Sequence, residues 1–231
     1  MARIPFPIPM PKTPDFFGSA RGRNAHHRRA ALERSRDTAS RDYHAFGFDY
    51  FDNPDLGIGY GGYHYDGRYA QSAADLTAYY QLPADARVLE IGCAKGFVLV
   101  EFALLGAQVC GLDTSAYAVA HAHEAVRDRL LIGDAATLPF PDNAFDLVIA
   151  KEVLPHINQD ALDRALAECG RVSRGALFFD IQCGETDDEQ AALNAWDPTH
   201  RAVHSEKWWR DRVAAVVPQA DIHLKRLFGS D

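Results

Sequence analysis

The sequence has no long hydrophobic run and few cysteines, and both absences limit what the chain can be. No stretch of its 231 residues approaches the roughly 18 consecutive apolar residues of a membrane-spanning helix. The N-terminus alternates apolar residues with proline and has no apolar core of the kind found in secretory signals. The four cysteines form no Cys-x-x-Cys pair. We therefore expect a cytoplasmic protein in a reducing compartment, with no membrane partner and no structural zinc.

Charge is distributed unevenly along the chain. Residues 1–41 carry nine basic and three acidic side chains, so their net charge is +6, and the remainder carries −14. A basic arm of this kind can bind nucleic acid, and it can equally dock on its own acidic body or on a second subunit, as in a homodimer. Between Gly18 and Asp42 no Phe, Tyr or Trp is interleaved with the basic residues. We do not expect nucleic acid as a partner.

Short apolar runs alternate with helical patterns from residue 87 onward. The runs predict strands at 87–91, 108–113, 130–134, 145–150, 175–181 and 221–228, and the segments between them predict helices at 97–105, 115–124, 160–169 and 205–217. An earlier helix is predicted from a Ser72 cap to residue 80. Continuous apolar strands that alternate with helices are typical of a parallel sheet covered on both faces. The sequence predicts an α/β fold, a Rossmann-like doubly wound three-layer sandwich.

The chain divides into three predicted parts. Residues 1–41 form a basic, Pro- and Arg-rich arm with a candidate helix at 24–38, residues 42–86 form an aromatic and glycine-rich lid segment followed by a helix, and residues 87–231 form the α/β domain. Residues 183–204 show no regular pattern.

The turn "VLEIGCAKGF" (residues 88–97) indicates where a ligand binds. A phosphate-binding P-loop places Lys after its last glycine, but here Lys95 precedes Gly96. A dinucleotide turn has Gly-x-Gly-x-x-Gly, and in that frame two of the glycine positions hold Ala94 and Phe97. The turn therefore fits neither a P-loop nor a dinucleotide-binding site.

The remaining pattern, Glu90-x-Gly92-x-x-x-Gly96, resembles the first motif of the class I S-adenosylmethionine-dependent methyltransferases. Asp113 ends the second strand 23 residues later, and the segments "GDAATLPF", "PDNAFDLVIA" and "KEVLPHI" follow in the order of that family. The resemblance covers about residues 88–157.

The resemblance implies S-adenosyl-L-methionine as the cofactor. Glu90 would receive its ammonium group, Asp113 its ribose hydroxyls, and Asp134 its adenine amino group, to which Ala135 would add a backbone N–H. The full set of expected cofactor-binding residues is Glu90, Gly92, Cys93, Gly96, Asp113, Thr114, Asp134, Ala135, Lys151, Tyr63 and Arg68. The last two belong to "YGGYHYDGR", which is similar to a segment that precedes the first motif in some bacterial methyltransferases. There Arg68 suits the methionine carboxylate of the cofactor.

The expected reaction is metal-independent methyl transfer to an oxygen or nitrogen of a small molecule, such as a sugar-derived or natural-product precursor. His156, His200 and His204 are the candidate general bases, because a neutral imidazole suits that task near physiological pH. His200 and His204 have a His-x-x-x-His spacing, but no paired-carboxylate spacing accompanies it, and we expect no metal site. An RNA or protein methyltransferase and a non-catalytic cofactor-binding regulator remain alternatives.

One departure from the family concerns the sheet. The family's sheet usually ends in two strands, the last antiparallel, but the chain after Pro218 is long enough for only one. Either a strand lies within 183–204 or the sheet is one strand short.

Overall fold

The computed structural model describes residues 13–18 and 39–228. Six strands form one parallel sheet in the order β3-β2-β1-β4-β5-β6. They are β1 Arg87–Ile91, β2 Gln108–Asp113, β3 Leu130–Ile132, β4 Phe145–Lys151, β5 Ser173–Cys183 and β6 Asp221–Arg226. The predicted parallel Rossmann-like sheet is confirmed. Because the chain moves outward from β1 in both directions, the carboxyl ends of β1 and β4 form the crevice in which such folds bind ligands.

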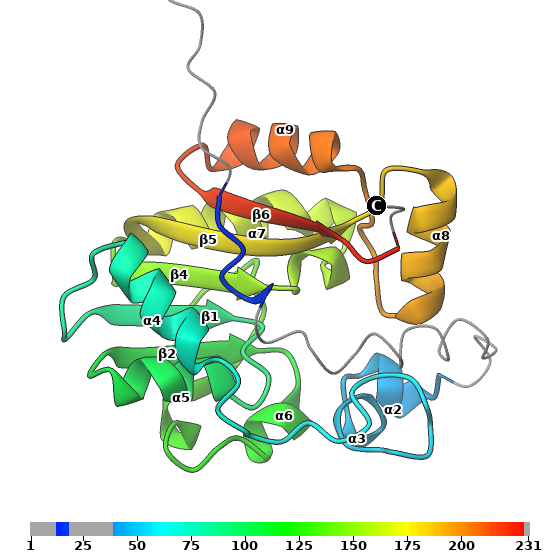
Figure 1. Ribbon diagram of the computed structural model, residues 1–231, viewed down its shortest axis with the longest axis horizontal. Coiled ribbons are helices and arrows are strands. Elements are labelled where there is room, and N and C mark those ends of the chain that lie inside the picture. The colour runs from blue at the N-terminus through cyan, green and yellow to red at the C-terminus, as the bar shows by residue number, and fades with distance from the viewer. Residues whose placement is uncertain (1–12, 19–38, 229–231) are drawn as a thin grey trace, which may run out of the picture.

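Helices cover both faces of the sheet (Figure 1). One face packs against α4 (Ala70–Tyr79) and α5 (Phe97–Leu104), and the opposite face packs against α7 (Gln159–Val172) and α9 (Glu206–Val216). The short helix α6 (Ala116–Ala120) follows β2. Val88 and Ile149 belong to the core on the side of α4 and α5, and Leu89 and Val148 belong to the core on the side of α7 and α9. All four side chains are fully buried. Burial on both faces explains why these strands are continuous apolar runs.

Residues from the N-terminal part close one end of the sheet. Residues 13–18 cross the β5 side of the sheet, where Phe16 and Phe17 pack against Phe178 (Figure 1). The short helices α2 (Arg41–His44) and α3 (Phe48–Phe51) lie near the end toward which the strands point. The candidate helix at 24–38 and most of the basic arm lie outside the described residues.

Three predictions about secondary structure were wrong. Ser72 does not cap α4, because the helix begins at Ala70 and the Ser72 side chain is buried within it. The helix after β2 is much shorter than predicted, ending at Ala120. The segment 183–204 is not irregular throughout, since it contains helix α8 (Asp187–Trp196). Within the described residues the sheet therefore ends at the parallel strand β6 and lacks the antiparallel last strand that the resemblance implies.

None of the described helices is long and apolar enough to cross a bilayer.

Candidate active site

A cavity of about 260 Å³, here called the first cavity, opens at the carboxyl ends of β1, β2 and β4. Six of the predicted cofactor residues line it: Gly92, Asp113, Thr114, Asp134, Ala135 and Lys151. They come from different strands because parallel strands bring their carboxyl ends to one edge of the sheet. Cys93, Gly96, Tyr63 and Arg68 do not line the first cavity.

Glu90 lies directly behind this cavity. Its neighbours Ile91 and Gly92 line the cavity, while Glu90 is only 3% exposed and its Oε2 atom has no hydrogen-bond partner among the described residues. Burial raises the pKa of Glu90 to about 8, against the opposing effect of Lys151 and with a further contribution from Asp113. A buried carboxyl group with a free oxygen is costly unless a ligand supplies a donor or a positive charge. This residue therefore fits the ammonium group of an amino-acid ligand.

Asp113 is held in place by the backbone. Its Oδ2 accepts a hydrogen bond from the Ala94 N–H at 2.7 Å, and its Oδ1 accepts one from the Ser115 N–H at 2.8 Å. Burial raises the pKa of Asp113, although these amide donors act against the shift. A carboxylate oxygen accepts more than one hydrogen bond, so both oxygens keep capacity for a ligand in the cavity.

The glycine turn is shaped by neighbouring protein groups as well as by the cavity. Gly92 has φ +69°, and a Cβ there would lie 2.4 Å from the Val153 Cγ2 atom. Ala94 adopts φ +48°, a left-handed conformation that costs a residue with a Cβ roughly 1–2 kcal/mol. Its N–H bond to Asp113 holds this strained conformation. Gly96 is required by its φ of +77° and by the nearby Val126 side chain rather than by the cavity.

The lid segment is tied to the glycine turn by a buried lysine. The Lys95 Nζ atom lies 2.6 Å from an Asp52 oxygen and donates to the Tyr63 carbonyl at 2.8 Å, and the Tyr117 hydroxyl donates to Asp52 at 2.7 Å. These contacts hold the lid so that Tyr50 and Tyr60 line the first cavity. The sequence did not assign these two tyrosines to the site.

A second cavity of about 110 Å³ adjoins the first. The two share five lining residues, which are Tyr50, Tyr60, Lys151, Glu152 and His156. Because these side chains border both spaces, a group bound in one cavity lies next to a group bound in the other. The second cavity is further lined by Arg68, Tyr69, Trp196, Asp197 and Lys225.

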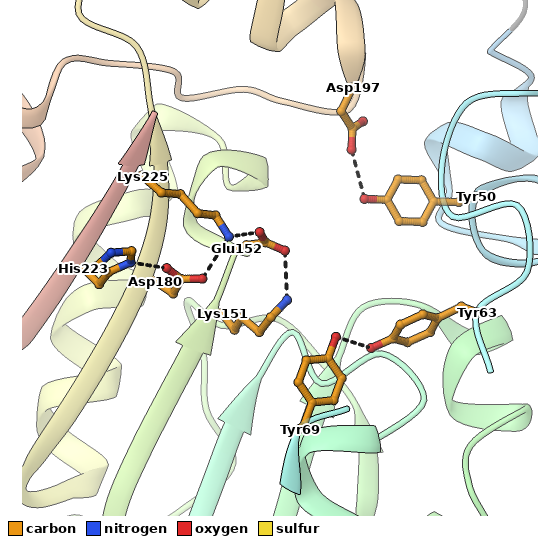
Figure 2. Close-up of polar contacts among 9 residues, drawn as sticks. All are labelled: Tyr50, Tyr63, Tyr69, Lys151, Glu152, Asp180, Asp197, His223 and Lys225. Atoms are coloured by element: carbon orange, nitrogen blue, oxygen red, sulfur yellow. Dashed lines mark hydrogen bonds and ion pairs between the residues drawn. The ribbon is translucent and has the colours of Figure 1, made fainter. Parts of the chain in front are cut away.

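Five titratable side chains form a chain of contacts (Figure 2), and three of them, Lys151, Glu152 and Lys225, line the second cavity. Lys151 lies 2.9 Å from Glu152, Glu152 also contacts Lys225, and Lys225 lies 3.0 Å from Asp180, which contacts His223 at 2.8 Å. Burial alone would lower the pKa of Lys151, but nearby tyrosines and carboxylates outweigh it and raise that pKa. Lys151 therefore presents a charged ammonium group at the wall between the two cavities.

The predicted bases His156 and His200 are neighbours. Their ring centroids are 4.7 Å apart, and the Asp197 carboxylate lies beside them (Figure 2 shows Asp197 with Tyr50). Burial lowers the pKa of His156, and it lowers the pKa of His200 to about 4, so both imidazoles are neutral near physiological pH. Burial would raise the pKa of Asp197, but the imidazoles and Thr199 hold it below its usual range. His156 borders both cavities, whereas His200 is buried behind it.

Three other predicted residues lie away from the first cavity. The His204 ring stacks on Trp208, its Nε2 contacts the Gln159 side chain, and it lines neither cavity. Tyr63 is buried with its hydroxyl 3.5 Å from that of Tyr69 (Figure 2) and also lines neither. Arg68 lines the second cavity and pairs with Asp66 at 2.8 Å.

Comparison with known proteins agrees with this geometry. A family model described as a methyltransferase domain matches residues 89–179, which run from β1 to β5 and contribute most of the first cavity. The chain contains a class I S-adenosylmethionine-dependent methyltransferase domain. S-adenosyl-L-methionine is the cofactor of this family, and the unpartnered Glu90 oxygen beside the glycine turn fits its amino-acid end.

Curated relatives of the methyltransferase domain align over part of their length. A ubiquinone biosynthesis O-methyltransferase from Rhodopseudomonas palustris is 41% identical over 78 residues, which cover 32% of this chain and 31% of that protein. A malonyl-[acyl-carrier protein] O-methyltransferase from Legionella pneumophila is 32% identical, covering 52% of this chain and 44% of that protein. The chain thus spans less than half the length of these relatives.

Solved structures support the same fold. The YcgJ protein from Bacillus subtilis has a TM-score of 0.53 at 23% identity, covering 62% of this chain and 66% of that one. The [4+2]-cyclase SpnF has a TM-score of 0.51 at 25% identity, covering 67% and 60%. Because a cyclase shares the fold of the methyltransferase domain, the fold alone does not establish the reaction.

Proposed function

We propose that this protein transfers the methyl group of S-adenosyl-L-methionine to an oxygen or nitrogen of a small molecule bound in the second cavity. The observation that carries the proposal is the wall that the two cavities share. Methyl transfer requires the attacking atom to lie in line behind the methyl carbon, with water excluded. A cofactor in the first cavity and an acceptor in the second would meet beside Lys151, Tyr50 and His156.

The cofactor's orientation follows from the polar groups of the first cavity. Its ammonium group would lie near Glu90, its ribose hydroxyls would donate to Asp113, and its adenine would lie near Asp134 and Ala135. This arrangement would place the sulfonium near Lys151 and the second cavity. The cofactor supplies the activated methyl group, so the protein's remaining tasks are to orient the acceptor and to accept its proton.

His156 is the proposed proton acceptor. Its Nδ1 atom lies 2.9 Å from the Thr199 hydroxyl, which itself donates to Asp197 at 2.6 Å. Because the Thr199 hydroxyl donates its proton to Asp197, it can only accept from His156, so the Nδ1 atom of His156 carries the ring proton. The Nε2 atom of His156 therefore carries the free lone pair. His200 is a less direct candidate because it does not border the second cavity.

The acceptor class follows from the lining of the second cavity. Aromatic side chains such as Tyr69 and Trp196 suit the face of a ring, and Arg68 and Lys225 suit hydroxyl or anionic groups. A hydroxylated ring, either sugar-derived or phenolic, has both features. The ubiquinone biosynthesis O-methyltransferase among the relatives favours the phenolic type.

A thermal-shift panel with S-adenosylhomocysteine, NAD and ATP tests the proposal. At about 100 times its dissociation constant, S-adenosylhomocysteine should add about 2.7 kcal/mol of stability, and the other two should add little. A response to NAD alone would refute the cofactor assignment. A response to S-adenosylhomocysteine should be followed by mass spectrometry of phenol and sugar panels incubated with S-adenosyl-L-methionine. Tight cofactor binding without any methylated product would instead indicate a regulatory domain.

Replacing Arg68 with alanine should weaken acceptor binding in the second cavity and leave cofactor binding in the first cavity nearly unchanged. Arg68 lines only the second cavity, so we expect S-adenosylhomocysteine affinity within about twofold of wild type. The KM for the acceptor should rise at least about tenfold, the size expected for one lost charge-assisted hydrogen bond. Calorimetry and steady-state kinetics measure the two effects. If cofactor affinity fell instead, Arg68 would bind the methionine carboxylate, as the sequence predicts.

A further inference from the structure

Three side chains with metal-ligating atoms meet at the border of the two cavities. His156 ends the short helix η4 (Leu154–His156), while Asp197 and His200 follow α8. Each offers one ligand atom, and the three atoms lie within 4.8 Å of one another. The two segments are pinned together, because the Pro155 carbonyl accepts hydrogen bonds from the backbone N–H groups of Arg201 at 2.7 Å and Ala202 at 2.9 Å. The cluster is therefore part of a fixed tertiary contact.

Among the described residues, hydrogen bonding leaves each imidazole with a free Nε2 lone pair. The His200 Nδ1 atom lies 3.2 Å from the Leu193 carbonyl, which can only accept, so Nδ1 carries the proton. Its Nε2 atom is buried and has no partner among the described residues. His156 likewise donates through Nδ1, to Thr199. An imidazole whose Nδ1–H is fixed by a protein acceptor is the usual form of a metal-binding histidine.

The charge of the cluster also favours a bound cation. Asp197 is 6% exposed and accepts hydrogen bonds from the hydroxyls of Tyr43, Tyr50 and Thr199 and from the Thr199 amide. In the described part of the chain no lysine or arginine lies within ion-pair distance of it. The guanidinium of Arg201 instead donates to the Pro198 and His200 carbonyls, and that side chain is exposed. A buried carboxylate beside two neutral imidazoles leaves one uncompensated negative charge.

We propose that His156, Asp197 and His200 bind a divalent transition-metal ion. Two imidazoles and one carboxylate suit ions such as Fe²⁺, Co²⁺ and Zn²⁺ and leave coordination positions open. His156 and Asp197 line the second cavity, so an open position would face an acceptor oxygen. A metal-bound hydroxyl is more acidic, so in this state its proton would pass to solvent, and His156 would be a ligand instead of the base. This replaces the metal-independent transfer that the sequence predicts, and binding of the ion itself does not rest on methyl transfer.

Titration of Co²⁺ into the chelator-treated full-length chain under reducing conditions tests the site. We expect one equivalent to bind, with visible absorption bands from the bound ion. His200→Ala and the near-isosteric Asp197→Asn should each weaken binding at least about 100-fold, more than the loss of a merely supporting contact. His204→Ala is the matched control, because His204 is a partly exposed histidine outside the cluster. It should bind Co²⁺ like the wild type.

Two further measurements make the result decisive. The adjacent pair His26 and His27 can bind metal on its own, so all titrations are repeated with both residues changed to glutamine. Stabilisation by S-adenosylhomocysteine, whose proposed cavity His200 does not line, shows that each variant is folded. The proposal would be overturned if Co²⁺ did not bind stoichiometrically, or if its binding were unchanged in both Asp197→Asn and His200→Ala. A proton or an amine would then be the cation that balances the charge of the cluster. Failure of S-adenosylhomocysteine to bind any form, with Co²⁺ binding intact, would overturn the proposed function alone.

Discussion

Asp113→Ala should raise the dissociation constant of S-adenosylhomocysteine about 1000-fold. The Asp113 carboxylate is held by two backbone amides at the cavity wall, where we propose that it accepts both ribose hydroxyls. Each hydrogen bond to a charged group contributes about 1.5–3 kcal/mol, and two of them together correspond to roughly three orders of magnitude in affinity. Isothermal titration calorimetry measures the change directly.

Controls separate a binding effect from a folding effect. Asp113→Ala also removes the acceptor for the Ala94 and Ser115 amides, so its melting temperature should fall as well. Asp113→Asn keeps one acceptor oxygen and should show a smaller loss of affinity. Asp142→Ala removes an exposed carboxylate that pairs with Arg171 far from the first cavity, and should leave affinity unchanged. Wild-type affinity in folded Asp113→Ala would refute the assignment of the ribose site.

The sheet and six residues that line the first cavity could be predicted from the sequence because both depend on local patterns. β1 and β2 have the predicted bounds, since each is a continuous apolar run that ends in a turn. Helix α8 was missed because its composition is polar and its apolar stripe weak. Its start had a readable signal in the capping-box sequence Thr186-x-x-Glu189, and the Thr186 hydroxyl accepts a hydrogen bond from the Glu189 amide.

The acceptor side could not be predicted because it depends on tertiary contacts. The Tyr50 hydroxyl donates to Asp197, which is 147 positions away in the sequence (Figure 2). Likewise, His200 and His204 look equivalent in the sequence, yet one is buried beside His156 and the other stacks on Trp208. No periodicity or spacing encodes such pairings. The proposed metal-binding cluster could not be predicted for the same reason, because its three residues come from two separate segments.

Cofactor affinity should depend strongly on pH through Glu90. Because the pKa of Glu90 is about 8, this side chain is mostly protonated in the free protein near neutral pH. Pairing with the cofactor's ammonium group favours the ionised form, so binding should release about one proton. From about pH 6 to about pH 7.5, S-adenosylhomocysteine affinity should therefore rise about 20-fold. Calorimetry in buffers of different ionisation enthalpy measures the proton release.

Glu90→Gln should remove this pH dependence, which separates Glu90 from its charged neighbours Lys151 and Asp113. The free proteins provide a second, opposite signature. A carboxyl group whose pKa is higher in the folded than in the unfolded state costs stability as the pH rises from about 4.5 to about 8, by up to roughly 5 kcal/mol. The free variant should therefore gain stability relative to wild type across that window, as measured by urea unfolding. An unchanged affinity profile in Glu90→Gln would show that another group receives the ammonium.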